Sequence, residues 1–109
     1  MEVYRIFKLK EGMGSKLKSA LERHQKDIDQ HLPKNMKNFE VLACPLKTSN
    51  EVLFRFECDN YDALESLENA KQNGLSKAWE DISACLAHEL NSDMTPFRMY
   101  KSVKEIANF

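Results

Sequence analysis

His24 is the side chain in this sequence best suited to acid–base chemistry. If residues 15–32 form a helix, His24 lies at the centre of its apolar stripe, between Leu21 and Ile28. An imidazole titrates near neutral pH and burial shifts its pKa, so His24 could line a pocket as a catalytic acid or base. The alternative, which the apolar surroundings favour, is a structural histidine that hydrogen-bonds a backbone carbonyl or a neighbouring side chain.

A metal site on the same helix is the third interpretation. Asp27 lies at the edge of the stripe, and His31 follows His24 by seven residues. That spacing separates the two imidazoles by about 10 Å along a helix axis, too far to bind one ion together. We therefore expect neither a metal nor a cofactor.

A second group of polar candidates lies on predicted strands. Arg55 and Glu57 are two residues apart and point to the same side of their strand, opposite the apolar side. With Tyr100 and Cys44 they could line a pocket for a small anionic or phenolic molecule. The alternative is a ladder of cross-strand ion pairs at a dimer interface.

Arg5 and Trp79 complete the candidate ligand-binding residues. Arg5 lies on the first predicted strand, and Trp79 lies on the apolar face of a predicted helix. The structural interpretation of Trp79 is a core side chain. No G-x-S-x-G, P-loop, G-x-G-x-x-G or H-E-x-x-H motif is present, so no familiar catalytic machinery is assembled in the sequence.

Composition restricts the class of protein. The 109 residues include 16 basic and 17 acidic side chains, which is a poor electrostatic match for nucleic acid. Three cysteines, with no C-x-x-C pair, indicate small buried side chains rather than a disulfide framework. Neither a signal peptide nor a membrane span is visible, so we expect a cytoplasmic protein that does not contact a membrane.

The positions of these residues depend on the elements that carry them. Apolar patterning predicts strands over 2–9, 39–46, 51–57 and 96–100, and helices over 15–32, 61–72 and 75–90. The β-α-β-β-α-β order predicts an α+β, ferredoxin-like domain over 1–109, with a four-stranded antiparallel sheet and both helical regions on one face. The short polar segment before residue 51 predicts an antiparallel hairpin. The tail over 102–109 is unassigned, although Val103, Ile106 and Phe109 could dock on some other surface.

The predicted strands are apolar on both sides. Tyr4 and Ile6 lie opposite Val3 and Phe7 on the first strand, for example. If one face of the sheet were left in water, it would expose a larger apolar patch than monomers usually carry. Packing that face on a second copy solves the problem, so the pattern favours a homodimer.

Residues 5–12, Arg-Ile-Phe-Lys-Leu-Lys-Glu-Gly, resemble the R-x-[YF]-x-L-K-P-G opening of NIPSNAP-like proteins, with Glu11 where that family usually has proline. Relatives of that family include the antibiotic-biosynthesis monooxygenases and the stress-responsive A/B-barrel proteins. The resemblance covers residues 2 to about 101 and implies a dimeric α/β barrel, in which two ferredoxin-like sheets close one barrel. Haem-degrading members use an asparagine on the first strand, which this chain lacks, with a tryptophan and a histidine; Trp79 and His88 match only the latter two.

Two functions from different classes follow. The first is a homodimeric protein that binds a small molecule in a pocket between sheet and helices, without catalysis. The alternative, implied by the resemblance, is a cofactor-independent monooxygenase-like enzyme for a phenolic or polycyclic compound, with Arg55 or Tyr100 as anchor and His24 as acid or base.

Overall fold

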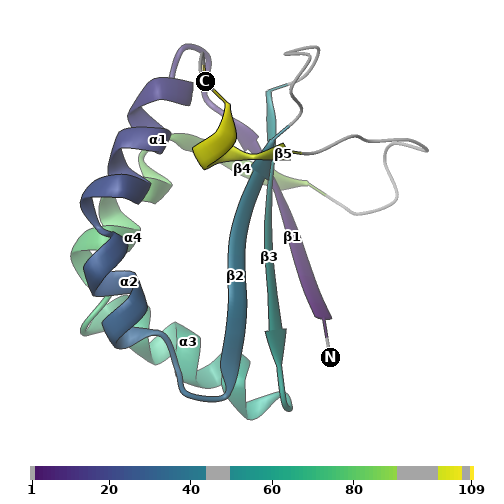
Figure 1. Ribbon diagram of the computed structural model, residues 1–109, viewed down its shortest axis with the longest axis vertical. Helices are drawn as coiled ribbons and strands as arrows, with labels where there is room; N and C mark the ends of the chain where they lie inside the picture. The colour runs from purple at the N-terminus through teal and green to yellow at the C-terminus, as the bar shows by residue number, and fades with distance from the viewer. Residues whose placement is uncertain (1, 44–49, 91–100, 107–108) are drawn as a thin grey trace.

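The computed structural model describes residues 2–43, 50–90, 101–106 and 109 (Figure 1). Within these residues no helix is long and apolar enough to cross a membrane. The elements follow one another as β1 (Glu2–Leu9), α1 (Gly14–Arg23), α2 (Gln25–His31), β2 (Met36–Ala43), β3 (Glu51–Cys58), α3 (Asp62–Gln72), α4 (Ser76–Ser83), β4 (Leu86–Leu90), β5 (Lys101–Ser102) and the 3-10 turn η1 (Val103–Glu105).

The strands form one antiparallel sheet in the order β4-β1-β3-β2-β5. All four helices cover the same face of this sheet, as Figure 1 shows in edge view. The predicted ferredoxin-like arrangement is confirmed, with β2-β3-β1-β4 as its four-stranded core. The predicted antiparallel pairing of the second and third strands is also confirmed.

The fourth strand of the sheet is not where the sequence predicts it. Helix α4 ends at Ser83, and Leu86–Leu90 is strand β4, which pairs with β1. The predicted helix over 75–90 is therefore wrong in its last third. Leu86 and Leu90 fit a helical stripe and an alternating strand equally well, and pairing with the edge of β1 selects the strand. The final strand predicted over 96–100 lies outside the described residues.

The first helical region is two helices with a junction at His24. Backbone angles of φ −99° and ψ 11° at His24 end α1, and α2 begins at the next residue. The backbone N–H of His24 still donates to the carbonyl of Ala20, and its carbonyl accepts from Ile28. The chain therefore bends at His24 without losing these hydrogen bonds, which is why the apolar periodicity runs through the junction.

The main core lies between the sheet and the helices. Val52 and Phe54 of β3 are buried in one cluster with residues of the helices, so their side of the strand faces the helices. Leu17 of α1 and Ile82 of α4 are buried against this layer. Each large apolar side chain removed from water in this way contributes about 1.5–3 kcal/mol.

The described C-terminal residues dock on the same core, a surface that the sequence did not identify. Val103 and Ile106 are buried in the main cluster, and Phe109 packs against it. The ammonium of Lys18 donates to the carbonyl of Ile106 at 2.8 Å. A Cβ at Gly14 would lie 2.7 Å from the backbone oxygen of Phe109, so the start of α1 needs a glycine where the tail crosses it.

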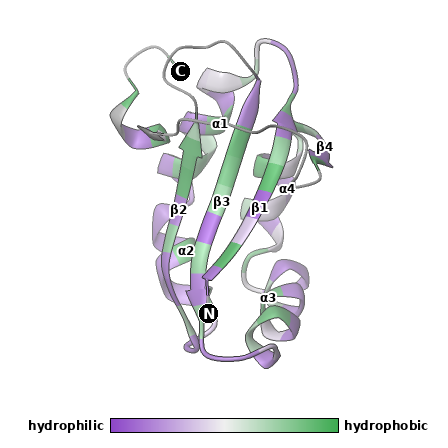
Figure 2. Ribbon diagram, turned by 90° about the vertical axis from the view of Figure 1, so that its right-hand side faces the viewer, coloured by the Kyte–Doolittle hydropathy of each residue, from purple (hydrophilic) through white to green (hydrophobic). Residues whose placement is uncertain are grey.

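The face that none of the described helices covers, which Figure 2 shows from the front, carries both polar and apolar residues. The register aligns Leu90, Ile6, Leu53 and Leu42 in one row across four strands. Ile6 and Leu53 are only 9% and 6% exposed in a single chain. The exposed apolar patch is therefore smaller than the sequence pattern suggests, and Tyr4, at 51% exposure, is its most exposed large side chain.

Candidate ligand-binding site

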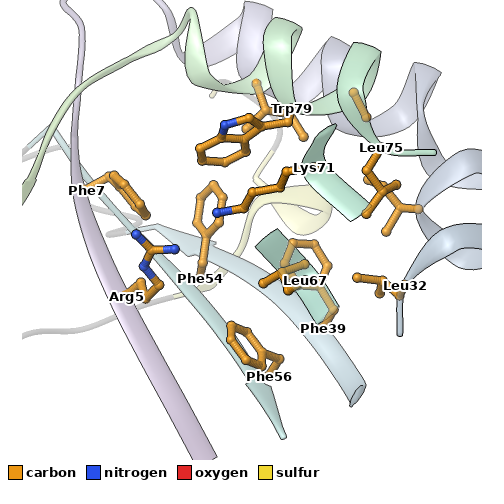
Figure 3. Close-up of a pocket in the computed structure, with 13 residues that line it drawn as sticks. Arg5, Phe7, Leu32, Phe39, Phe54, Phe56, Leu67, Lys71, Leu75 and Trp79 are labelled. Carbon is orange, nitrogen blue, oxygen red and sulfur yellow. The ribbon is translucent and has the colours of Figure 1, made fainter. Parts of the chain in front are cut away.

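A cavity of about 60 Å³ lies between the sheet and the helices (Figure 3). This is roughly four times the space that one buried water needs, so a small organic group fits. The described lining is almost entirely apolar, with two cationic side chains among aromatic and aliphatic ones. It comprises Arg5, Phe7, Ile28, Leu32, Phe39, Phe54, Phe56, Leu67, Lys71, Leu75, Ala78, Trp79 and Ile82.

Aromatic side chains from three strands form the sheet side of the cavity. The ring centroids of Phe7 and Phe54 lie 5.1 Å apart, and Phe39 meets Phe54 edge-on at 6.1 Å. The alternation of side chains along each strand brings these rings to the face below the helices. Trp79 of α4 covers them from the helical side (Figure 3). The result is an apolar cavity lined by aromatic rings on both the sheet side and the helical side.

Lys71 extends from α3 into this apolar setting. Its side chain is 12% exposed, and its ammonium lies 3.0 Å from a carboxylate oxygen of Glu68. The same ammonium lies 4.3 Å from the ring centroid of Trp79, a cation–π distance. A lysine is seldom buried to this extent without partners. These two contacts hold the charge at the edge of the cavity.

Arg5 holds the second positive charge. Its Nε and Nη2 donate to the two carboxylate oxygens of Glu89 at 3.0 and 2.9 Å, and its guanidinium lies 5.3 Å from the ring centroid of Phe7. The hydrogen bond from Arg5 lowers the pKa of Glu89, and the bond to Glu89 raises the pKa of Arg5. Lys71 also lowers the pKa of Glu89 through its charge, so the two cations and Glu89 form one electrostatic group.

Of the residues predicted to bind a ligand, Arg5 and Trp79 line the cavity. Arg55 and Glu57 lie on the opposite face of the sheet. There Arg55 donates to Glu40 across the strands at 2.8 Å, and Glu57 accepts from Asn38. The remaining two, Cys44 and Tyr100, lie outside the described residues.

His24 is buried, at 7% exposure, but does not line the cavity. Its Nε2 lies 2.7 Å from a carboxylate oxygen of Asp81 on α4, and its Nδ1 lies 3.7 Å from Asp27. The contact with His24 lowers the pKa of Asp81, and Lys77 and Arg23 lower it further. His24 thus joins the helix junction to α4. In the part of the chain that the structure describes, no three His, Cys, Asp or Glu side chains gather as a metal site.

Sequence reasoning missed Lys71 and the four phenylalanines of the cavity wall. Lys71 looks like an ordinary surface lysine near the end of a weakly amphipathic helix. Its place in the cavity is recognisable only in the structure, because Trp79 and Glu89 approach Lys71 from other elements. The phenylalanines have the pattern of core residues, and nothing in the sequence indicates that a cavity lies against them.

Comparisons with known proteins find neither a family model nor a curated protein that matches this sequence. Solved structures do match. A NIPSNAP family protein of unknown function from Agrobacterium tumefaciens has a TM-score of 0.62 and 14% identity over 93% of this chain and 86% of that one. An uncharacterised NIPSNAP domain protein from Burkholderia xenovorans has a TM-score of 0.59 and 16% identity over 89% of this chain and 100% of that one.

A third match is tetracenomycin F2 cyclase from Streptomyces glaucescens, a type-II polyketide cyclase. Its TM-score is 0.60 and its identity 12%, over 89% of this chain and 86% of that one. At these identities the likeness establishes the fold alone. The chain has the ferredoxin-like, dimeric α/β-barrel fold. This is the fold that the resemblance of residues 5–12 to NIPSNAP-like proteins implies.

Proposed function

We propose that this protein binds a small apolar molecule in the cavity between its sheet and its helices. The observation that carries the proposal is the lining. Eleven apolar side chains from strands and helices enclose the space, and only Arg5 and Lys71 among the described lining residues bring polar groups to it. A small space with flat aromatic walls and a few fixed polar groups is typical of a ligand site.

The binding form that we propose is a homodimer, joined through the sheet face that no described helix covers. Proteins with this fold typically form dimers, which supports the proposal. Leu42 and Leu90, both half-buried, supply apolar surface on this face, and the row next to them holds the exposed Tyr4 and the Arg55–Glu40 pair. A cytoplasmic setting is part of the same proposal, and the buried thiols of Cys58 and Cys85 are compatible with a reducing compartment.

An enzyme is the second candidate, favoured by the likeness to a polyketide cyclase. Acid–base catalysis needs a group that exchanges a proton within reach of the substrate. Among the described lining residues, Arg5 and Lys71 are the only titratable side chains, and His24 is engaged with Asp81 elsewhere. Binding without turnover therefore fits the cavity better.

A cavity-filling substitution tests the proposed site. Leu67→Trp places a larger side chain in the space, so we expect the affinity for the neutral probe 3-phenylpropan-1-ol to fall by about tenfold or more. Ligand-observed NMR titration measures this affinity. Leu64→Trp is the matched control, because Leu64 is also half-buried on α3 but does not line the cavity.

The two variants separate a site effect from a general loss of structure. Binding that survives Leu67→Trp unchanged, or that Leu64→Trp weakens equally, contradicts the assignment of the cavity. Turnover of a bound phenolic compound by the wild-type protein would favour the enzyme instead.

A further inference from the structure

The charges around the cavity are arranged asymmetrically. Arg5 and Lys71 line it, whereas their carboxylate partners, Glu89 and Glu68, do not. Both carboxylates extend toward water, with side chains 45% and 61% exposed. Figure 3 shows the ammonium of Lys71 and the guanidinium of Arg5 pointing toward one another beside Phe54. A ligand in the cavity thus meets two positive charges and no described negative one.

Both cations keep hydrogen-bond donors that their partners do not use. Glu89 occupies Nε and one N–H of Nη2 of Arg5, and Nη1 makes no hydrogen bond with another described residue. The ammonium of Lys71 has three N–H groups, of which Glu68 accepts one. The aromatic contacts with Phe7 and Trp79 fix the direction of both side chains. The donors are therefore positioned before any ligand arrives.

We propose that the ligand is a carboxylic acid with a compact apolar group, such as a single aromatic ring. This inference rests on the proposed function. The ring occupies the cavity between Phe54 and Trp79, and the carboxylate accepts hydrogen bonds from Arg5 and Lys71. Charge-assisted bonds to a carboxylate are stronger than neutral ones, and the low-dielectric lining strengthens them further. The size of the apolar group follows from the 60 Å³ available.

Three probes that share one phenylpropyl carbon skeleton and differ in their terminal functional group test this inference. They are 3-phenylpropionate, 3-phenylpropan-1-ol and 3-phenylpropylammonium. Each is titrated at pH 7 into the full chain, in the assembly state that the chain forms in solution. Trp79 is the single tryptophan of the chain and lines the cavity, so its fluorescence reports occupancy. We expect the anion to bind about tenfold more tightly than the alcohol, and the cation to bind most weakly.

Substitutions identify the groups responsible. Lys71→Gln and Arg5→Gln should each weaken binding of the anion more than binding of the alcohol, so that most of the preference for the anion is lost. Lys26→Gln removes the same charge from an exposed residue of α2 that does not line the cavity, and it should change neither affinity. Arg5→Lys should restore part of the preference, because it returns the charge without the planar fork.

The outcomes separate this inference from the function on which it rests. Equal affinities for the anion and the alcohol, both abolished by Leu67→Trp, would overturn the carboxylate and keep the binding site. A preference for the anion that survives both glutamine variants would assign the charge recognition to other residues. Binding of none of the three probes would overturn the proposed function itself.

Discussion

At the scale of single residues, the contact between His24 and Asp81 joins two helices that are distant in sequence. His24 sits at the junction of α1 and α2, and Asp81 lies on α4. Arg23 approaches the same carboxylate at 3.3 Å. One carboxylate thus serves two basic side chains at the bend, which makes Asp81 a structural residue in this account.

This contact predicts a dependence of stability on pH. The pKa of Asp81 is lower in the folded chain than in the unfolded one, chiefly because of the hydrogen bond with His24. Its contribution is therefore complete above the unfolded pKa of about 4 and is lost as the pH falls through the lowered folded value. The loss of stability caused by Asp81→Asn should have its full size at pH 6 and should shrink toward pH 3.

Urea unfolding of the wild type and the variant at a series of pH values measures this difference. Asp29→Asn is the control, since Asp29 is exposed on α2 and its carboxylate accepts a hydrogen bond from the neutral amide of Gln25. A difference between wild type and Asp81→Asn that stays constant down to pH 3 would refute the assignment.

At the scale of elements, the docked tail completes the core. Ile106 packs beside Val103 and beneath the start of α1, where Lys18 fixes its carbonyl. Truncating a buried isoleucine removes its transfer free energy and leaves a cavity. Ile106→Ala should therefore lower the free energy of unfolding by about 2 kcal/mol or more.

Lys104→Ala tests the same segment without touching the core. Lys104 is exposed in the turn between the two buried residues, so its loss should change stability by less than about 0.5 kcal/mol. Equal and small effects of both substitutions would mean that the tail contributes little to the fold.

Most of the element order could be predicted from the sequence, and the exceptions have one physical origin. Alternation and helical periodicity identify β1, β3 and the first helical region directly. They fail at Leu86–Leu90, because Leu86 and Leu90 satisfy both periods and no glycine or proline marks the end of α4. There the pairing with β1, a contact between residues about 80 positions apart, decides the structure.

The candidate site was predictable only in part, for a related reason. Residue type and place on a predicted element identify Arg5 and Trp79. They do not identify Lys71, because its burial depends on Trp79 and on the cluster around Glu89. Arg55 also shows this limit. From the sequence, Arg55 could either anchor a ligand or form a cross-strand ion pair, and the structure pairs it with Glu40 on the neighbouring strand.

At the scale of the whole molecule, the sheet divides the protein into a helical side with the cavity and a side that no described helix covers (Figures 1 and 2). If the latter joins two copies, a charge on it should separate them. Tyr4 lies on β1, an inner strand of the sheet, and is half-exposed on this face. Tyr4→Lys places like charges in the interface and should convert the dimer to a monomer.

Tyr61→Lys is the matched control. Tyr61 is the other strongly exposed large hydrophobic side chain among the described residues, and it lies before α3 on the helical side. Light scattering after size exclusion should report a dimer for this variant and for the wild type. A dimer that persists in a folded Tyr4→Lys variant would place the interface elsewhere.

The central claim is that each chain of a dimer holds one small molecule between sheet and helices. A native mass spectrum of the full chain with 3-phenylpropionate tests it most directly, because subunit number and bound mass are read from the same ion. We predict a dimer that carries up to two ligands, with the bound mass strongly reduced by Leu67→Trp and retained in Leu64→Trp. A bare monomer at micromolar concentration, with no bound mass at any ligand concentration, would contradict the account.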